Sequence, residues 1–245
     1  MKKIDDQKKS SPFISLNGVS KFIFESDGKK KFLLRDINLE VKMDSFIIIN
    51  GDSGAGKTTL VNVMGGLSSF QEGTITFENQ IFSPENFSEY SKKIRSDSGF
   101  IFQDYWLLDS LTVFENVELA SLFSHSNNRK ENFRWMSIEE VLKFVDILHL
   151  KDRYPENLSG GEKQRVAIAR SLIRKPKVIF CDEPTASLHS KIELKIINLL
   201  KEVNKKFGVI IVMVTHKETL KRIADHLVTL WDGRLAEEQL VKIFQ

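Results

Sequence analysis

The sequence contains one cysteine among 245 residues and no hydrophobic run long enough to cross a membrane. Cys181 alone cannot form an intramolecular disulfide, and no short spacing of Cys and His is typical of a zinc site. We therefore expect a reducing compartment, namely the cytosol. The longest apolar runs, such as residues 209–214, are far shorter than the ~20 residues that a membrane-spanning helix requires.

Neither sign of charge dominates, because 36 Lys and Arg residues stand against 33 Asp and Glu residues, for a formal net charge of +3. This balance gives no electrostatic argument for a nucleic-acid partner, and we expect none. Residues 1–12 are polar and lack the apolar segment of a signal peptide, so we expect a disordered tail. A chain of this length buries roughly three quarters of the surface that it exposes when unfolded. A sizeable core can therefore form without disulfides or a structural metal.

Three short apolar runs, rich in Val and Ile, predict strands buried on both faces of a mostly parallel sheet: residues 46–50, 178–181 and 209–214. Apolar residues recur with helical spacing in residues 138–148 and 192–203. This alternation of strands and helices is typical of an α/β fold.

Two other segments predict antiparallel pairing. Residues 13–41 alternate between apolar and polar and are split by a turn at residues 26–28, which predicts two antiparallel strands. Residues 227–235 predict a hairpin whose tight turn is Asp232-Gly233. The stretch of about 84–157 is more polar and helical, which predicts a helical subdomain inserted in the α/β core.

The strongest signal is the segment GDSGAGKTT at residues 51–59, which matches the phosphate-loop pattern G-x-x-x-x-G-K-[ST] between a predicted strand and a predicted helix. Glycines let the backbone approach phosphate closely, so its N–H groups can face the anion. Lys57 adds a positive charge between the β- and γ-phosphates, and Thr58 supplies a hydroxyl for Mg²⁺. A glycine-rich turn without function is the alternative, but four constrained positions rarely agree by chance in this setting. We therefore predict a nucleotide site formed by Gly51, Asp52, Ser53, Gly54, Ala55, Gly56, Lys57, Thr58 and Thr59.

Two acids end the second apolar run, in the segment VIFCDE at residues 178–183. Asp182 at the carboxyl end of a buried strand can hold the Mg²⁺ that bridges the nucleotide phosphates. Glu183 can reach a water behind the γ-phosphate and act as a general base for hydrolysis. Two acids at a strand end are often merely exposed to solvent, so this motif gains its weight from the phosphate loop.

The segment LSGGEKQR at residues 158–165 leads into a helical pattern. Ser159 and Glu162 form a capping box, which is a sufficient structural reading of those two residues. Gly160 and Gly161 in the first turn weaken a helix, so capping alone does not account for them. They are expected where a helix N-terminus must approach a phosphate closely.

The three motifs, in this order and spacing, resemble the ATPase subunit of an ATP-binding cassette (ABC) transporter. The resemblance extends over residues 13–245 and implies one phosphate-loop ATPase domain that uses ATP and Mg²⁺. Two such domains dimerise head to tail, so Ser159, Gly160 and Gly161 would contact the γ-phosphate held by the other subunit. Gln103 matches the family glutamine that touches the metal and the water, and His216 matches the family histidine that holds the γ-phosphate and the attacking water.

Two positions depart from the family pattern. Where the family places an aromatic residue to stack on adenine, this chain offers Phe24, or Phe22 if the alignment slips. Phenylalanine suffices, because stacking needs only a π face. His189 stands where the family usually has an aspartate that couples the two sites of the dimer, so altered coupling or pH dependence is expected.

The segment at residues 99–117, which includes GFIFQDYWLL, resembles the macrolide-export and lipoprotein-release group. This likeness favours export or mechanical work through separate integral membrane permease subunits, with the chain at the cytoplasmic face of the membrane. An importer ATPase, a soluble ABC ATPase acting on nucleic acid or ribosomes, and a module that does not hydrolyse ATP are the alternatives. The active pair is expected to be a homodimer or a pairing with a second ATPase subunit.

Overall fold

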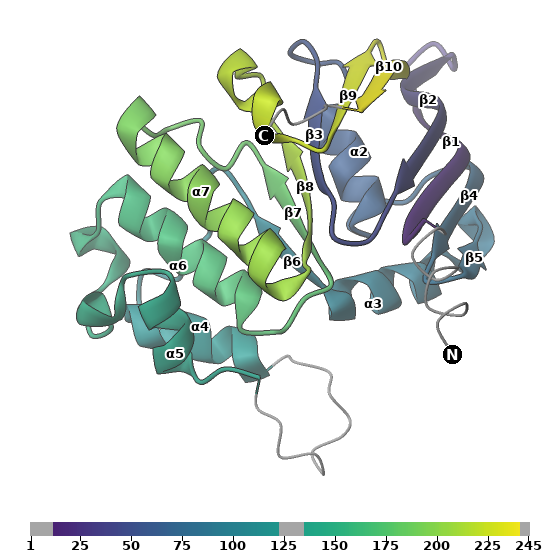
Figure 1. Ribbon diagram of the computed structural model, residues 1–245. Coiled ribbons are helices and arrows are strands. Elements are labelled where there is room, and N and C mark those ends of the chain that lie inside the picture. The colour runs from purple at the N-terminus through teal and green to yellow at the C-terminus, as the bar shows by residue number, and fades with distance from the viewer. Residues whose placement is uncertain (1–11, 123–134, 241–245) are drawn as a thin grey trace, which may run out of the picture.

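The computed structural model describes residues 12–122 and 135–240 (Figure 1). The tail predicted at residues 1–12 lies, apart from Pro12, outside the described residues. Two sheets organise the described part of the chain, and helices cover the larger sheet on both faces (Figure 1). No helix within these ranges has the length and apolar character needed to span a membrane.

The larger sheet has six strands in the order β10-β9-β3-β8-β7-β6. Its neighbours run parallel except for the antiparallel pair of β9 and β10. All three apolar runs form the predicted strands at its centre, and the predicted hairpin turns through Asp232 and Gly233, which both have positive φ. The strands are β3 (Phe46–Asn50), β6 (Ser98–Ile101), β7 (Val178–Asp182), β8 (Ile210–Val214), β9 (His226–Trp231) and β10 (Arg234–Leu240).

The smaller sheet has four antiparallel strands in the order β2-β1-β4-β5. It contains the antiparallel pair predicted for residues 13–41, with Gly28 in the turn at a φ of 80°. The strands are β1 (Ile14–Phe24), β2 (Lys30–Val41), β4 (Glu72–Phe77) and β5 (Gln80–Phe82).

Six α-helices and four short 3₁₀ helices lie within the described residues. The α-helices are α2 (Lys57–Met64), α3 (Phe87–Asp97), α4 (Val113–Leu122), α5 (Ile138–Phe144), α6 (Gly160–Leu172) and α7 (Ser190–Phe207). The 3₁₀ helices are η1 (Pro84–Asn86), η2 (Leu148–Leu150), η3 (Pro155–Asn157) and η4 (Glu218–Ile223).

Two hydrophobic cores meet at the six-stranded sheet, because alternate side chains of each strand face opposite sides. Ile48 and Ile211 pack with helices α4 to α7, whereas Ile47 and Ile210 pack with α2, α3 and the smaller sheet. In Figure 1, α2 lies between the two sheets, and α6 and α7 cover the other face. Burial on both faces explains why the central strands read as continuous apolar runs.

The stretch of about 84–157 is less uniform than the predicted helical subdomain. Strand β6 lies within it and pairs with β7 at the edge of the six-stranded sheet. Helix α3 packs with the core of the smaller sheet rather than with α4 and α5. The sequence did not predict β6, because an edge strand of four residues is too short to show a detectable alternation of apolar and polar residues. As a helical unit the insertion thus includes α4 and α5, while the part before them belongs to the two sheets.

Candidate nucleotide-binding site

The phosphate loop connects β3 to α2 with a backbone that only glycine allows at two points. Gly51 has a φ of 149°, and a Cβ there would lie 2.2 Å from the carbonyl oxygen of Leu230. Gly56 has a φ of 101° and is the N-cap of α2, and its Cβ would lie 2.6 Å from the carbonyl oxygen of Leu33. Neighbouring backbone on β9 and β2 therefore holds the loop close to the start of α2. The loop backbone is thus already folded around the N-terminus of α2, as the binding of an anion there requires.

Lys57, the first residue of α2, points back along the loop. Its Nζ donates hydrogen bonds of 2.8 Å to the carbonyl oxygens of both Gly51 and Asp52. The residue is only 8% exposed, so its ammonium group is the charge that the loop encloses. An ammonium in this position attracts the phosphates of a bound nucleotide.

Thr58 and Asp182 meet across two elements that are far apart in the sequence. The Thr58 Oγ1 donates to the Asp182 Oδ1 at 3.1 Å, which joins the start of α2 to the end of β7. A hydroxyl and a carboxylate are the hard oxygen donors that Mg²⁺ prefers, so these residues fit the expected ion. Within residues 12–122 and 135–240 no group of three or more His, Cys, Asp or Glu could hold a metal alone. Phosphate oxygens and water would have to complete the coordination.

Burial raises the pKa of Asp182, and the adjacent charge of Glu183 acts in the same direction, while the hydrogen bond from Thr58 opposes both. A raised pKa in the folded protein means that the charged carboxylate disfavours folding. Such a cost is present above the folded-state pKa and disappears as the pH falls through it. A bound cation would offset it.

We expect Asp182→Asn to raise the melting temperature without nucleotide by roughly 2 °C at neutral pH. Asparagine keeps an oxygen that can accept from Thr58 but carries no charge; solvent screening at this half-exposed position keeps the gain small. The gain should shrink as the pH falls into the range where Asp182 itself is protonated. Thermal unfolding at several pH values measures both trends. A variant that is less stable than the wild type at neutral pH would contradict the assigned cause.

Glu183 and His216 form the reactive end of the site. The His216 Nδ1 lies 2.9 Å from the Glu183 Oε1, which links the residue after β7 to a residue just after β8. Glu183 has a φ of 50°, a left-handed conformation that strains a residue with a side chain, and its amide donates to the Val214 carbonyl. The parallel pairing of β7 with β8 brings the two side chains together.

A pocket of about 600 Å³ unites these residues. Its lining includes Lys57, Glu183, His216 and the first residues of the phosphate loop, so the structure brings together the predicted phosphate and hydrolysis groups. It also includes Trp231, which is 63% exposed and was not predicted from the sequence. The available sequence signal was its position at the end of a predicted strand, directly before the Asp232-Gly233 turn. In the structure the Gly233 amide donates to the Ala55 carbonyl, which places this turn beside the phosphate loop.

The signature residues do not line this pocket. The capping box forms as predicted, because the Ser159 Oγ accepts from the Glu162 amide and the Glu162 carboxylate accepts from the Ser159 amide. Hydrogen bonds from Ser159 lower the pKa of Glu162. Gly161 has a packing reason as well, since a Cβ there would lie 2.6 Å from the Ile192 side chain. At the N-terminus of α6, Ser159 is exposed, whereas Gly160 is partly buried and a Cβ there would lie 3.1 Å from the Tyr105 hydroxyl.

Gln103 and Phe24 also lie outside the pocket lining. Gln103 is exposed and follows β6, whose carboxyl end lies beside that of β7, at the same sheet edge as Asp182. Phe24 is 66% exposed at the end of β1. Phe22 instead packs against Phe32, and the Lys30 ammonium lies 4.0 Å from its ring centroid. The Phe24 ring lies edge to face with Phe22 at a centroid distance of 5.7 Å, and its greater exposure makes it the better candidate for stacking on a base.

His189 is the exposed N-cap residue of α7, and its side chain makes no capping hydrogen bond. Histidine has no side-chain oxygen to accept hydrogen bonds from the free N–H groups of the first turn. A positive charge on its ring would interact unfavourably with the positive end of the helix dipole.

We expect His189→Asp to stabilise the protein by about 1 kcal/mol through an added N-cap. It should also change the cooperativity of ATP hydrolysis, because this position lies in the loop between Glu183 and α7. Chemical unfolding measures the first effect, and turnover against ATP concentration measures the second. His189→Asn is the matched control, since it caps the helix without a negative charge. Identical kinetics in all three proteins would show that the departure is neutral for coupling.

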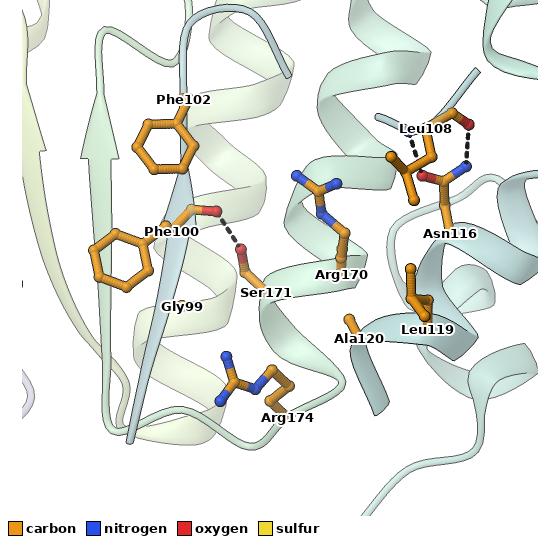
Figure 2. A pocket seen from close by; sticks show the side chains of 10 residues that line it. All are labelled: Gly99, Phe100, Phe102, Leu108, Asn116, Leu119, Ala120, Arg170, Ser171 and Arg174. Atoms are coloured by element: carbon orange, nitrogen blue, oxygen red, sulfur yellow. Dashed lines mark hydrogen bonds between the residues drawn. The ribbon is translucent and has the colours of Figure 1, made fainter. Parts of the chain in front are cut away.

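A second hollow, of about 320 Å³, lies between the edge strand β6 and helices α4 and α6 (Figure 2). The Ser171 Oγ donates to the Phe100 carbonyl at 2.9 Å and closes one side of it. The Asn116 side chain accepts from the Leu108 amide and donates to the Leu108 carbonyl, which fixes the other side. Its lining residues are Gly99, Phe100, Phe102, Leu108, Asn116, Leu119, Ala120, Arg170, Ser171 and Arg174.

A family model described as ABC transporter matches residues 34–186, more than half of the chain. The chain belongs to the ABC transporter family. It is an ABC transporter ATPase subunit, and the predicted family, fold class and ATPase activity are confirmed.

Curated relatives of this ABC ATPase include proteins of different descriptions. An uncharacterized ABC transporter ATP-binding protein of Methanocaldococcus jannaschii is 37% identical over 88% of this chain and 94% of its own length. A putative ABC transporter ATP-binding protein of Mycoplasma genitalium is 35% identical over 94% of this chain and 72% of its own length. The methionine import ATP-binding protein MetN of Pasteurella multocida is 38% identical over 92% of this chain and 64% of its own length.

Solved ABC cassettes share the fold. A bacterial ABC transporter cassette solved as a dimer has a TM-score of 0.82 and 35% identity, and covers 94% of this chain and 100% of its own. A dimeric post-hydrolysis cassette bound to ADP and Pi has a TM-score of 0.78 and 33% identity, with the same coverage of both chains. CbiO1 from Clostridium perfringens, part of the ABC transporter complex CbiONQ, has a TM-score of 0.80 and 29% identity, and covers 95% of this chain and 90% of its own.

Proposed function

We propose that this ABC ATPase binds MgATP between two cassettes and powers export, or mechanical work across a membrane, through separate membrane subunits. The observation that carries the catalytic part is the single pocket that contains Lys57, Glu183 and His216. An acid held in a strained backbone conformation beside a histidine is the arrangement expected of a base that activates water.

Each side chain has a separate task in the proposed reaction. Lys57 and the loop amides hold the phosphates, and Thr58 with Asp182 would hold Mg²⁺, which neutralises charge between them. Glu183 takes a proton from the attacking water, and the hydrogen bond to His216 orients its carboxylate. His216 is exposed on the pocket side, where its other ring nitrogen can face the γ-phosphate.

We propose that the second cassette is needed because the signature residues lie outside the pocket of their own chain. The exposed Ser159 and the partly buried Gly160 lie at a helix N-terminus, which favours a negatively charged group. In a head-to-tail pair they would reach the γ-phosphate of the other subunit. The similar cassettes solved as dimers support the pairing of two such domains, in either a homodimer or a pair with a second ATPase subunit.

The hollow in Figure 2 is the proposed contact with a membrane subunit. Phe100, Phe102 and Leu108 give it apolar walls, and Trp106 beside it is 63% exposed and stacks on Phe102 at a centroid distance of 4.4 Å. These residues belong to the segment whose sequence resembles the export and lipoprotein-release group. The subfamily likeness therefore coincides with a surface suited to a short amphipathic helix. We propose the cytoplasmic face of a membrane as the place of action.

Import is the second candidate, because the methionine import proteins are among the relatives. Purification of the tagged chain from detergent-solubilised membranes, followed by identification of the membrane protein bound to it, separates the two. A partner with few spans and a large extracytoplasmic domain supports export. A partner that works with a solute receptor overturns the export proposal, and recovery with ribosomes or DNA overturns both.

A further inference from the structure

Lys217, the residue after His216, is tied to the loop that follows Glu183. Its Nζ donates to the Thr185 carbonyl at 2.8 Å and lies 2.8 Å from the Glu193 Oε1 in the first turn of α7. Thr185 adds a third bond, since its Oγ1 donates to the same Glu193 oxygen at 3.0 Å. A lysine after β8 thus holds both ends of the loop between β7 and α7.

The three groups are largely shielded from water. Thr185 is 2% exposed, and the side chains of Glu193 and Lys217 are 9% and 21% exposed. An ion pair that is screened so little by solvent, with all its partners hydrogen-bonded, fixes geometry more firmly than a surface pair. Removing one member would leave the other charge without compensation.

Two neighbouring contacts therefore join the segment after β7 to the segment after β8. Glu183 meets His216 at 2.9 Å, and two residues further along Thr185 meets Lys217. We infer that Lys217 is a positioning residue for hydrolysis: through Thr185 and Glu193 it holds the Glu183 carboxylate and the His216 ring in register. The inference rests on the proposed roles of Glu183 and His216. Lys217 itself does not line the pocket, so it acts through these two side chains.

The test must separate positioning from simple stability. Lys217→Met removes the ammonium group and leaves Glu193 as an uncompensated buried charge. The double variant Lys217→Met with Glu193→Gln removes both charges and leaves an amide that can still accept from Thr185. Lys217→Arg keeps donors for both partners, and Lys195→Met removes an exposed lysine of α7 as the matched control. For each protein, kcat, the KM for ATP and the melting temperature are measured.

For Lys217→Met we expect a loss of kcat of about 10- to 100-fold with KM changed less than about threefold, and a lower melting temperature. In the double variant the melting temperature should recover while kcat stays low, and Lys217→Arg should restore most of kcat. Recovery of kcat together with stability in the double variant would overturn the inference, as would wild-type kcat in Lys217→Met. Glu183→Gln in the same assay is the separate check: full turnover there would refute the proposed base and leave the Lys217 result to stand as a structural effect.

Discussion

Replacement of Glu183 by glutamine is expected to slow ATP turnover by about 10²- to 10⁴-fold while ATP binding stays close to wild type. Glutamine has the size of glutamate and can still accept a hydrogen bond from the His216 Nδ1, so the local structure should survive. It cannot take a proton from water. Because the γ-phosphate then stays in place, the ATP-bound pair of cassettes should persist for longer.

Steady-state ATPase assays measure the first effect, and sedimentation of the protein with ATP and Mg²⁺ measures the second. Glu202→Gln is a suitable control, because Glu202 is an exposed glutamate of α7 outside the pocket. Turnover in Glu183→Gln that equals the wild-type value would exclude Glu183 as the base. Loss of turnover without any ATP-dependent dimer would keep the base but remove the argument that the γ-phosphate joins two subunits.

The central strands and the phosphate loop could be predicted because their signals are local. A strand buried on both faces must be apolar along its length, and β3, β7 and β8 are. The loop needs glycine at Gly51 and Gly56 because neighbouring backbone leaves no room for a Cβ. In both cases the structural requirement falls on residues within one short segment, so the pattern can be recognised from the sequence alone.

The contacts between distant residues could not be predicted in this way. Glu183 lies 33 positions from His216, and Lys217 lies 32 positions from Thr185. Neither pair follows a helical or strand period, because each depends on the register of β7 against β8. The resemblance to ABC ATPases identified Glu183 and His216 as candidates, but Lys217 belongs to no recognisable motif. Its role depends on Glu193, a buried glutamate that nothing in the sequence distinguishes from the other acidic residues of the predicted helix.

The sequence did not reveal strand β6 within the stretch of about 84–157 for a related reason. Residues 98–101 are too few to show an alternating pattern, yet pairing with β7 makes them the edge of the large sheet. In the proposed function this edge is important, because β6 and the residues that directly follow it line part of the hollow of Figure 2 and include Gln103. A partner seated in that hollow would therefore lie only a few residues from the proposed metal and water site.

Replacement of Lys57 by alanine is the prediction with the largest expected effect on binding. Lys57 is 8% exposed, and its ammonium group donates hydrogen bonds to two loop carbonyls, so the cation is held in a fixed orientation at the N-terminus of α2. A charge-assisted hydrogen bond contributes about 1.5–3 kcal/mol, which corresponds to a Kd for ATP that rises about 10- to 150-fold. Calorimetric titration with ATP measures the change directly.

Lys57→Met separates the charge from the packing of the side chain. Methionine keeps an unbranched apolar stem among the buried residues of α2, whereas alanine leaves a gap there. If the charge is decisive, the Kd values of both variants rise alike, while the melting temperature falls mainly in Lys57→Ala. Lys92→Ala, at an exposed position of α3, should change neither quantity. Unchanged ATP affinity in Lys57→Met would mean that the loop amides alone hold the phosphates, and the nucleotide site would then rest on the backbone of residues 51–59 rather than on this side chain.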